Sequence, residues 1–348
     1  HNSRMRTRVR IIGYGLAGRY FHTPLLQAAG FDIKAVVSSR VDEIKETLPN
    51  AAIVANEAEL LSRSDIDLVV IATPTQLHAE QTRAALEANK HVLVDKPFTV
   101  TVAEARELTA LAHEKQRVLT VFQNRRWDND FQTLRKLMRE NKLGEVHSYH
   151  ARWDRFRPAP SEGWRNEPDP ASGMLYDLGS HMLDQVLVLF GRPDWLQADV
   201  FTQRPGAQTE DGFEILMGKG PRLRITLGVS YLAADGGWRF RVHGTEASYL
   251  KAELDPQEAQ SRAGIRAEDP QFGVEPPELA GKLVHGESGR SETIVSEKGS
   301  WVTLYQELRR CLEEGGPNPV TPEEATAVIE LLEAVYRSVR EGRRVALS

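Results

Sequence analysis

The stretch Val9–Gly18, VRIIGYGLAG, decides the fold. Its first residues are mostly apolar and β-branched, which favours a strand. Gly13, Gly15 and Gly18 follow in the spacing G-x-G-x-x-G, with Leu16 and Ala17 before the last glycine. These glycines permit a tight turn, the close approach of a pyrophosphate and close packing of helix on strand, and the helix N-terminus offers N–H groups to phosphates. Glycine-rich turns also serve purely structural purposes, so the motif predicts dinucleotide binding because it starts a strand–helix series.

The fold expected from this series is α/β. Short β-branched runs alternate with helical stretches, Gln76–Asn89 and Val102–Lys115 among them, which predicts a doubly wound parallel (Rossmann) sheet in residues 5–123. The expected strands are Val9–Ile12, Asp32–Val37, Ile53–Val54, Leu68–Ala72, His91–Val94 and Val118–Phe122. In such a sheet the ligand binds at the carboxyl ends of the strands.

Residues 124–348 predict a second α/β domain with a large, mostly antiparallel open sheet. Its expected helices are Asp130–Asn141, Leu175–Phe190, Trp301–Glu314 and Pro322–Glu341, the last capped by Thr321. Its expected strands are Val146–Phe156, Ala198–Gln203, Gly212–Met217, Leu223–Tyr231, Trp238–His243 and Ala247–Leu250. The polar, turn-rich stretch Asp255–Glu278 is expected to be a surface excursion.

The composition restricts the partners. The 348 residues carry 44 basic and 49 acidic side chains, a net charge of -5, so there is no basic footprint for nucleic acid or an anionic membrane. Apolar runs are too short to cross a bilayer. The single cysteine, Cys311, excludes an internal disulfide and fits a reducing compartment, so we expect a cytoplasmic protein with a small-molecule substrate.

The end of the second strand indicates which dinucleotide binds. NAD-binding folds usually place an acidic residue there to hold the ribose 2′-hydroxyl. This chain instead has Ser38-Ser39-Arg40, and a guanidinium with two hydroxyls suits the 2′-phosphate of NADP. A solvated arginine at a strand end is the alternative interpretation, and NAD remains possible.

Two motifs carry candidate catalytic groups. Asp95-Lys96-Pro97 follows the fifth strand, which places Lys96 at the carboxyl edge of the sheet, although a surface lysine in a loop is the simpler alternative. In Tyr176–Asp184, YDLGSHMLD, helical spacing predicts that Asp177, His181 and Asp184 share one face. A histidine can accept the hydroxyl proton of an alcohol as hydride leaves. Two other interpretations of these residues are a helix-capping pair and a metal site. A metal site would need a fourth ligand, and none is apparent, so no metal is expected.

Two probable loops hold aromatic and basic residues, Asn124-Arg125-Arg126-Trp127 and Gly163-Trp164-Arg165. A ring there could stack on a nicotinamide or a sugar, and an arginine could contact a phosphate. Asn124, Trp164 and Arg165 are therefore candidate cofactor-binding residues. Interdomain packing explains the same residues equally well.

Together the motifs GYGLAG, ATPTQLH, DKP and DLGSH resemble the Gfo/Idh/MocA family, and within it the branch of NADP-dependent scyllo-inositol dehydrogenases. The resemblance implies that Lys96, Asp177 and His181 match the catalytic residues. It also implies that Thr73, Pro74, His78 and Asp95 line the cofactor cleft, with Asp95 replacing the usual glutamate. A homodimer or homotetramer formed through the second sheet is implied as well.

The activity expected is hydride transfer between NADP(H) and a secondary alcohol or ketone of a cyclic polyol or sugar. It requires Lys96 and His181 to act on the same hydroxyl. A reductase of aldoses or deoxy-ketoses is a close variant. A nucleotide-binding redox sensor without turnover and an NAD-assisted glycosidase are the alternatives from other classes.

Overall fold

In the computed structural model, which describes residues 6–54, 56, 62, 64–160 and 166–347, the chain divides into two units of tertiary structure. Unit 1 contains the chain up to Trp127 together with Gln257–Phe272 and Ser300–Ile329. Unit 2 contains Asp128–Pro256, Gly273–Gly299 and the chain from Glu330 onward. Each unit thus combines separate stretches of chain, whereas the division expected from sequence was linear; the boundary at 123/124 stays a prediction.

Unit 1 contains a parallel sheet of six strands in the order β3-β2-β1-β4-β5-β6. Its strands are β1 (Arg8–Ile12), β2 (Asp32–Val37), β3 (Ala52–Val54), β4 (Leu68–Ile71), β5 (His91–Val94) and β6 (Leu119–Val121). All four residues of β4 are buried, as expected for a central strand covered on both faces. The order changes direction between β1 and β4, so the predicted doubly wound fold is confirmed.

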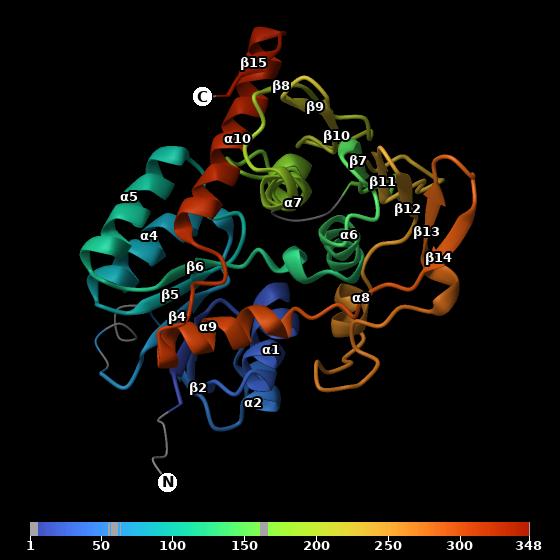
Figure 1. Ribbon diagram of the computed structural model, residues 1–348. Coiled ribbons are helices and arrows are strands. Elements are labelled where there is room, and N and C mark those ends of the chain that lie inside the picture. The colour runs from blue at the N-terminus through green and yellow to red at the C-terminus, as the bar shows by residue number, and fades with distance from the viewer. Residues whose placement is uncertain (1–5, 55, 57–61, 63, 161–165, 348) are drawn as a thin grey trace. The chain divides into compact units, whose positions relative to one another are not determined.

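Helices cover both faces of this sheet because the chain winds outward from β1 in one direction and from β4 in the other. In Figure 1, α4 (Thr75–Glu87) and α5 (Val102–Glu114) lie to one side of the strands, and α1 (Thr23–Ala28) and α2 (Val41–Thr47) lie to the other. The helix after the glycine turn begins with a π-helical stretch, η1 (Gly18–His22). Unit 1 also contains η2 (Asn124–Trp127), α8 (Gln257–Arg262), α9 (Val302–Glu314) and the start of α10 (Pro322–Glu341).

The prediction that Asp255–Glu278 is a surface excursion is wrong for the first part of this stretch, which includes α8 and buried residues. Gln257 of α8 is fully buried, accepts from the backbone N–H of Trp301 at 2.8 Å and donates to the carbonyl of Trp127 at 3.3 Å. The polar composition hid this packing because a buried glutamine that bonds to backbone groups satisfies its polarity internally. A short 3-10 helix, η5 (Pro277–Leu279), follows later in the chain.

Unit 2 contains a sheet of nine strands in the order β14-β13-β12-β11-β7-β10-β9-β8-β15. Among the described strands of this sheet, the β7–β10 pairing alone is parallel, so the expected, mostly antiparallel sheet is confirmed. The strands are β7 (Val146–Arg152), β8 (Trp195–Phe201), β9 (Gly212–Lys219), β10 (Leu223–Ser230), β11 (Phe240–Gly244), β12 (Ala247–Lys251), β13 (Gly281–His285), β14 (Ser291–Ile294) and β15 (Val345–Ala346). The last three were not expected from the sequence.

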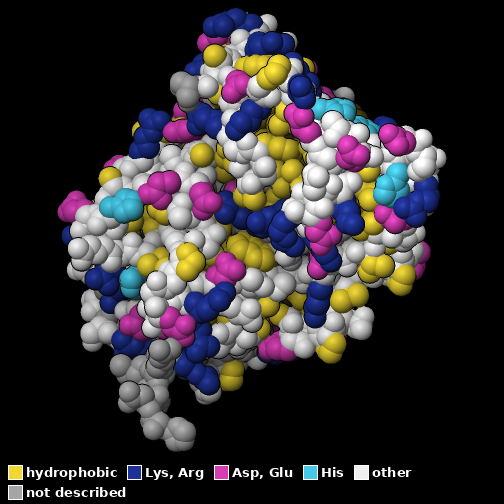
Figure 2. Space-filling view, in the orientation of Figure 1, with side chains coloured by type: hydrophobic (Ala, Val, Ile, Leu, Met, Phe, Trp, Pro, Cys, Tyr) yellow, Lys and Arg dark blue, Asp and Glu magenta, His cyan; other side chains and the backbone are white. Residues whose placement is uncertain are grey.

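The helices described in unit 2 are α6 (Asn129–Arg139), the π-helical η4 (Leu175–Gly179), α7 (Ser180–Phe190), the 3-10 helix η5 and the remainder of α10. Across the described ranges, no helix has the length and hydropathy to cross a membrane. The same ranges contain no group of three His, Cys, Asp or Glu side chains able to hold a metal. On the face drawn in Figure 2, basic and acidic side chains are interspersed over much of the surface.

Candidate functional site

The three glycines after β1 occupy different environments. Gly13 has φ +93°, and a Cβ there would lie 2.5 Å from the carbonyl oxygen of Ala72. A Cβ on Gly18 would lie 2.4 Å from the carbonyl oxygen of Gly13. A Cβ on Gly15 would meet no atom within 4 Å. Internal packing therefore explains Gly13 and Gly18, whereas Gly15 borders a space that the protein leaves open, as the close approach of a pyrophosphate requires.

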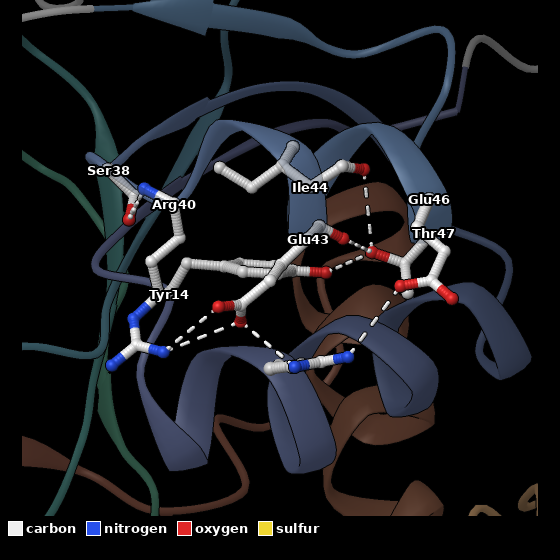
Figure 3. Close-up of polar contacts among 8 residues, drawn as sticks. Tyr14, Ser38, Arg40, Glu43, Ile44, Glu46 and Thr47 are labelled. Carbon is white, nitrogen blue, oxygen red and sulfur yellow. Dashed lines mark hydrogen bonds and ion pairs between the residues drawn. The ribbon is translucent and has the colours of Figure 1, made fainter.

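The end of β2 lies beside this turn, because the N–H of Gly13 donates to the carbonyl of Val37 at 3.0 Å. Beyond it, Ser38 accepts from the N–H of Arg40 through Oγ at 3.2 Å, and Ser39 is exposed. The side chain of Arg40 is 54% exposed, and its Nη1 lies 3.2 Å from Oε1 of Glu43 (Figure 3). On the other side of the glycine turn, Leu16 and Ala17 are helical and half-buried.

The end of β4 is tied to the end of β5 by His78. Its Nδ1 lies 2.9 Å from the carbonyl oxygen of Pro97, and its Nε2 lies 2.9 Å from that of Thr73. Burial lowers the pKa of His78, although the charge of Asp95 and the hydrogen bonds to the backbone oppose the shift. Pro74 is the N-cap residue of α4, and the hydroxyl of Thr73 donates to Oε1 of Gln81 at 2.6 Å.

Asp95 is engaged by neighbours inside unit 1. Its Oδ1 accepts from the N–H of Lys96 at 2.8 Å, and its Oδ2 lies 3.4 Å from Nε2 of His22. The other nitrogen of His22 lies 2.7 Å from the hydroxyl of Tyr305 in α9. Burial would raise the pKa of Asp95, but the hydrogen bond and charge of His22 outweigh it, helped by His78 and Lys96, and lower that pKa. Burial raises the pKa of the Tyr305 hydroxyl well above its ordinary value, and the Asp95 charge adds to the shift.

Lys96 follows β5 at the carboxyl edge of the sheet and is half-buried; its peptide bond to Pro97 is cis. The Asn124–Trp127 segment is the 3-10 helix η2 rather than an open loop, and Asn124 is buried. Within it, Arg125 pairs with Glu258, and Arg126 pairs with Glu324 at 3.2 Å, so both arginines contribute to packing in unit 1. Trp164 and Arg165 lie outside the described residues.

Unit 2 carries the other candidate catalytic groups. Asp177 lies in the π-turn η4 and is half-buried, whereas His181 and Asp184 of α7 are buried, 4% and 2% exposed. The common face expected for all three assumed α-helical spacing. Across η4 the chain is π-helical instead, with hydrogen bonds between residues five apart, so the common face of the three side chains stays a prediction.

An aromatic ring that no motif indicated lies against His181. The Trp153 ring after β7 stacks on its imidazole at 6.1 Å between centroids and 29° between planes. The guanidinium of Arg239 lies 5.1 Å from the Trp153 ring on the same unit. That guanidinium also donates to Oε1 of Gln185 at 2.8 Å and lies 3.3 Å from Oδ2 of Asp130. A buried cation, held by Gln185 of α7 and Asp130 of α6, therefore supports the ring that contacts His181.

Asp177 acts electrostatically on a second aromatic residue. Burial raises the pKa of Tyr231, and among its neighbours Arg155 lowers that pKa while Asp177 raises it. The guanidinium of Arg204 lies 4.8 Å from the Tyr231 ring and is itself held by Asp211 at 2.9 Å. Tyr231 thus combines a hydroxyl and a ring with nearby basic groups, and the charge of Asp177 acts on the same hydroxyl. Hydroxyl, aromatic and charged groups together suit a polyhydroxylated ligand.

Comparisons with known proteins agree with both units. Residues 7–123 match the model described as oxidoreductase family, NAD-binding Rossmann fold, and residues 135–347 match the model described as oxidoreductase family, C-terminal alpha/beta domain. The chain is 40% identical over 343 residues to scyllo-inositol 2-dehydrogenase (NADP(+)) IolW of Bacillus subtilis, covering 98% of this chain and 96% of that protein. It is 41% identical over 342 residues to the uncharacterized oxidoreductase YdgJ of Escherichia coli, covering 98% and 99%.

Among solved structures, a putative oxidoreductase yvaA from Bacillus subtilis aligns with a TM-score of 0.96 and 38% identity over 100% of both chains. A Rossmann sheet with an open glycine turn, joined to a second α/β unit of this kind, defines an NAD(P)-dependent dehydrogenase or reductase. More narrowly, the chain belongs to the Gfo/Idh/MocA family of oxidoreductases.

Proposed function

We propose that the protein transfers hydride reversibly between NADP(H) and a secondary alcohol of a cyclic polyol resembling scyllo-inositol. The observation that supports this substrate most directly is the 40% identity, over almost the whole of both chains, to an enzyme named scyllo-inositol 2-dehydrogenase (NADP(+)). The ring of Tyr231 with the guanidinium of Arg204 beside it, and the charge of Asp177 that acts on the Tyr231 hydroxyl, add chemical support, because sugars and polyols bind through hydroxyl contacts and stacking on rings.

The residues that would hold the dinucleotide are those at the carboxyl ends of β1, β2, β4 and β5. Gly15 would admit the pyrophosphate, and Ser38, Ser39 and Arg40 would bind the adenosine ribose with its 2′-phosphate. A guanidinium at that place and the absence of an acid from the strand end support a preference for NADP. The bound nicotinamide supplies the hydride acceptor for oxidation of the alcohol.

Three side chains would perform the proton chemistry. In the proposed reaction the ammonium of Lys96 donates to the reacting oxygen and stabilises negative charge that develops on it. The imidazole of His181 takes the hydroxyl proton as the C–H bond breaks and returns it in the reverse direction. Asp177 orients the substrate and the imidazole. The stacked Trp153 limits the orientations that the ring of His181 can adopt.

A substrate panel with matched variants tests this proposal. Wild type should reduce NADP with scyllo-inositol or a related polyol, and Lys96→Met should lose about 10²- to 10⁴-fold in kcat, as removal of a positioned acid–base group does. NADPH binding should persist within a fewfold. Lys282→Met removes the same charge from an exposed position of strand β13 and should change neither quantity. Tight NADPH binding without turnover of any polyol or sugar would replace this proposal with a redox sensor.

The preference between cofactors has its own test. Arg40→Asp should lower kcat/KM for NADP and leave that for NAD equal or higher, because a carboxylate repels the 2′-phosphate and accepts from a 2′-hydroxyl. An unchanged ratio of the two constants would exclude Arg40 as the determinant. We also propose that the protein forms a homodimer or homotetramer through the nine-stranded sheet, which sedimentation analysis would test. A cytoplasmic location is a further part of the proposal, and cell fractionation would test it.

A further inference from the structure

Two arginines of unit 1 converge on one carboxylate beside the glycine turn. Oε2 of Glu43 lies 2.9 Å from Nη1 of Arg19, and Oε1 of the same carboxylate lies 3.2 Å from Nη1 of Arg40. Figure 3 shows the carboxylate of Glu43 turned toward the guanidinium of Arg40, with the ring of Tyr14 beside it. Arg40 follows β2, and Arg19 directly follows the last glycine of the motif. Arg19 lies in η1 and Glu43 in α2, and Arg40 is the N-cap residue of α2, so the cluster joins two helical elements.

The backbone under this cluster is held in place. The N–H of Arg19 donates to the carbonyl of Gly15 at 3.0 Å, which couples Arg19 to the glycine turn. Ile44, next to Glu43, is fully buried and anchors α2 on the sheet. The phenol of Tyr14, which lies within the glycine motif, hydrogen-bonds to the hydroxyl of Thr47 at the end of α2. Glu43 is therefore positioned by the same contacts that position the glycine turn.

The location of this carboxylate matters for the choice of dinucleotide. NAD-binding folds hold the ribose 2′-hydroxyl with an acid near the end of the second strand, and the end of β2 lacks one here. Glu43 supplies an acid from the following helix, in contact with the arginine that would bind a 2′-phosphate. Guanidinium groups bind carboxylates and phosphates through the same fork of donors, so the two anions compete for the same partners.

We propose that Glu43 is a specificity-determining residue that competes with the 2′-phosphate of NADP for Arg40 and Arg19, and that Arg19 is the second phosphate-binding arginine. With NADP the two guanidinium groups turn from Glu43 to the phosphate, and the remaining carboxylate repels it. With NAD the carboxylate accepts a hydrogen bond from the 2′-hydroxyl. Glu43 thus lowers NADP affinity and supports NAD use, which deepens the proposed function and rests on its NADP site.

Binding of adenine nucleotides to the cofactor-free protein tests this without any turnover. Calorimetry would give Kd values for 2′,5′-ADP, which carries the 2′-phosphate, and for 5′-AMP, which does not. Glu43→Gln keeps the shape and removes the charge, and should tighten 2′,5′-ADP about five- to tenfold, as expected for loss of a like charge about 4 Å away in a solvated site. Binding of 5′-AMP should stay level or weaken. Arg19→Gln should weaken 2′,5′-ADP about tenfold and 5′-AMP less than twofold, as loss of one charge-assisted contact to phosphate predicts.

Glu46→Gln is the matched control. It removes the same charge from the same helix, but Glu46 is 74% exposed and its Oε2 lies 3.8 Å from Nη2 of Arg19. Its effect on 2′,5′-ADP should stay below twofold. If Glu43→Gln leaves the 2′,5′-ADP affinity unchanged or weakens it, competition by Glu43 is refuted. If Arg19→Gln has no effect, Arg19 is not a ligand. If Arg40→Gln also has no effect, the proposed NADP site itself fails, which separates the two hypotheses.

Discussion

Replacement of Gly15 by alanine should separate cofactor binding from folding. A Cβ on Gly15 would enter space that contains no protein atom within 4 Å, and this residue has no positive φ that alanine would strain. The cofactor-free protein should therefore keep its stability or gain up to about 1 kcal/mol through the smaller entropy of its unfolded chain. The added methyl group instead occupies the space through which a pyrophosphate would approach the backbone.

The magnitude follows from the contact that is lost. A hydrogen bond from a backbone N–H to a charged group contributes about 1.5–3 kcal/mol, so its loss should weaken dinucleotide binding about 10- to 100-fold. NADPH and NADH share the pyrophosphate, so both should weaken by the same factor. Gly18→Ala is the contrasting variant, because its Cβ would lie 2.4 Å from a backbone oxygen. Overpacking of this kind costs about 1–3 kcal/mol and should lower Tm by roughly 2–10 °C.

Fluorescence titration with NADPH and NADH gives the affinities, and thermal unfolding of the cofactor-free protein gives the stabilities. Gly15→Ala should weaken the affinity for both dinucleotides and leave Tm unchanged or higher, whereas Gly18→Ala should lower Tm. If Gly15→Ala binds both dinucleotides as tightly as wild type, the open space beside Gly15 does not receive the pyrophosphate. If it lowers Tm as much as Gly18→Ala does, the space is not open.

Two further predictions concern stability. Burial lowers the pKa of His91 to about 4, and its Nδ1 accepts from the N–H of Val118 at 2.9 Å, so unfolding takes up a proton below pH 6.5. The folded state should lose up to about 3 kcal/mol as the pH falls from about 6.5 to about 4, and His91→Gln should flatten the pH dependence of Tm in that interval; an unchanged slope would contradict this. Arg239→Met should destabilise unit 2 by about 3–5 kcal/mol, because Asp130 would remain buried without its 3.3 Å partner, and the double variant with Asp130→Leu should recover much of that loss; no recovery would mean that the pair does not couple.

Local sequence patterns were enough to predict the parallel sheet of unit 1 and to place the candidate cofactor-binding residues after its strands. The run Leu68–Ile71 is apolar at every position, which is typical of a strand buried on both faces. The parallel order then places the residues after β1, β4 and β5 at one edge. The capping prediction at Thr321 is confirmed as well, since its hydroxyl accepts from the N–H of Glu324 at 3.2 Å. Each of these three predictions depends on residues that are close in sequence or on the general rule that parallel strands place their carboxyl ends at one edge of the sheet.

Contacts between distant stretches of chain could not be predicted in this way. The stacking of Trp153 on His181 depends on how β7 and α7 pack, and neither residue's local sequence indicates the other. The pairing of Arg40 with Glu43 has the i,i+3 spacing that a helix would predict, but the approach of Arg19 to the same carboxylate depends on two separate βα turns. The π-turn before α7 also lacks a composition signal, so the spacing of Asp177 and His181 was interpreted as α-helical.

The contacts of Asp95 explain why an aspartate fits where the family pattern has a glutamate. The resemblance implies a glutamate before the Lys-Pro pair, and the shorter aspartate closes back on the N–H of Lys96 at 2.8 Å. Its other oxygen lies 3.4 Å from His22, which in turn contacts Tyr305 at 2.7 Å, so a carboxylate, an imidazole and a phenol link the turn after β5 to η1 and α9. An added methylene would have to fit between fully buried neighbours, because His22 and Tyr305 have no exposed surface. The contacts of Asp95 thus fix the backbone of the turn that carries Lys96, and they link this turn to His22 of η1 and, through His22, to Tyr305 of α9.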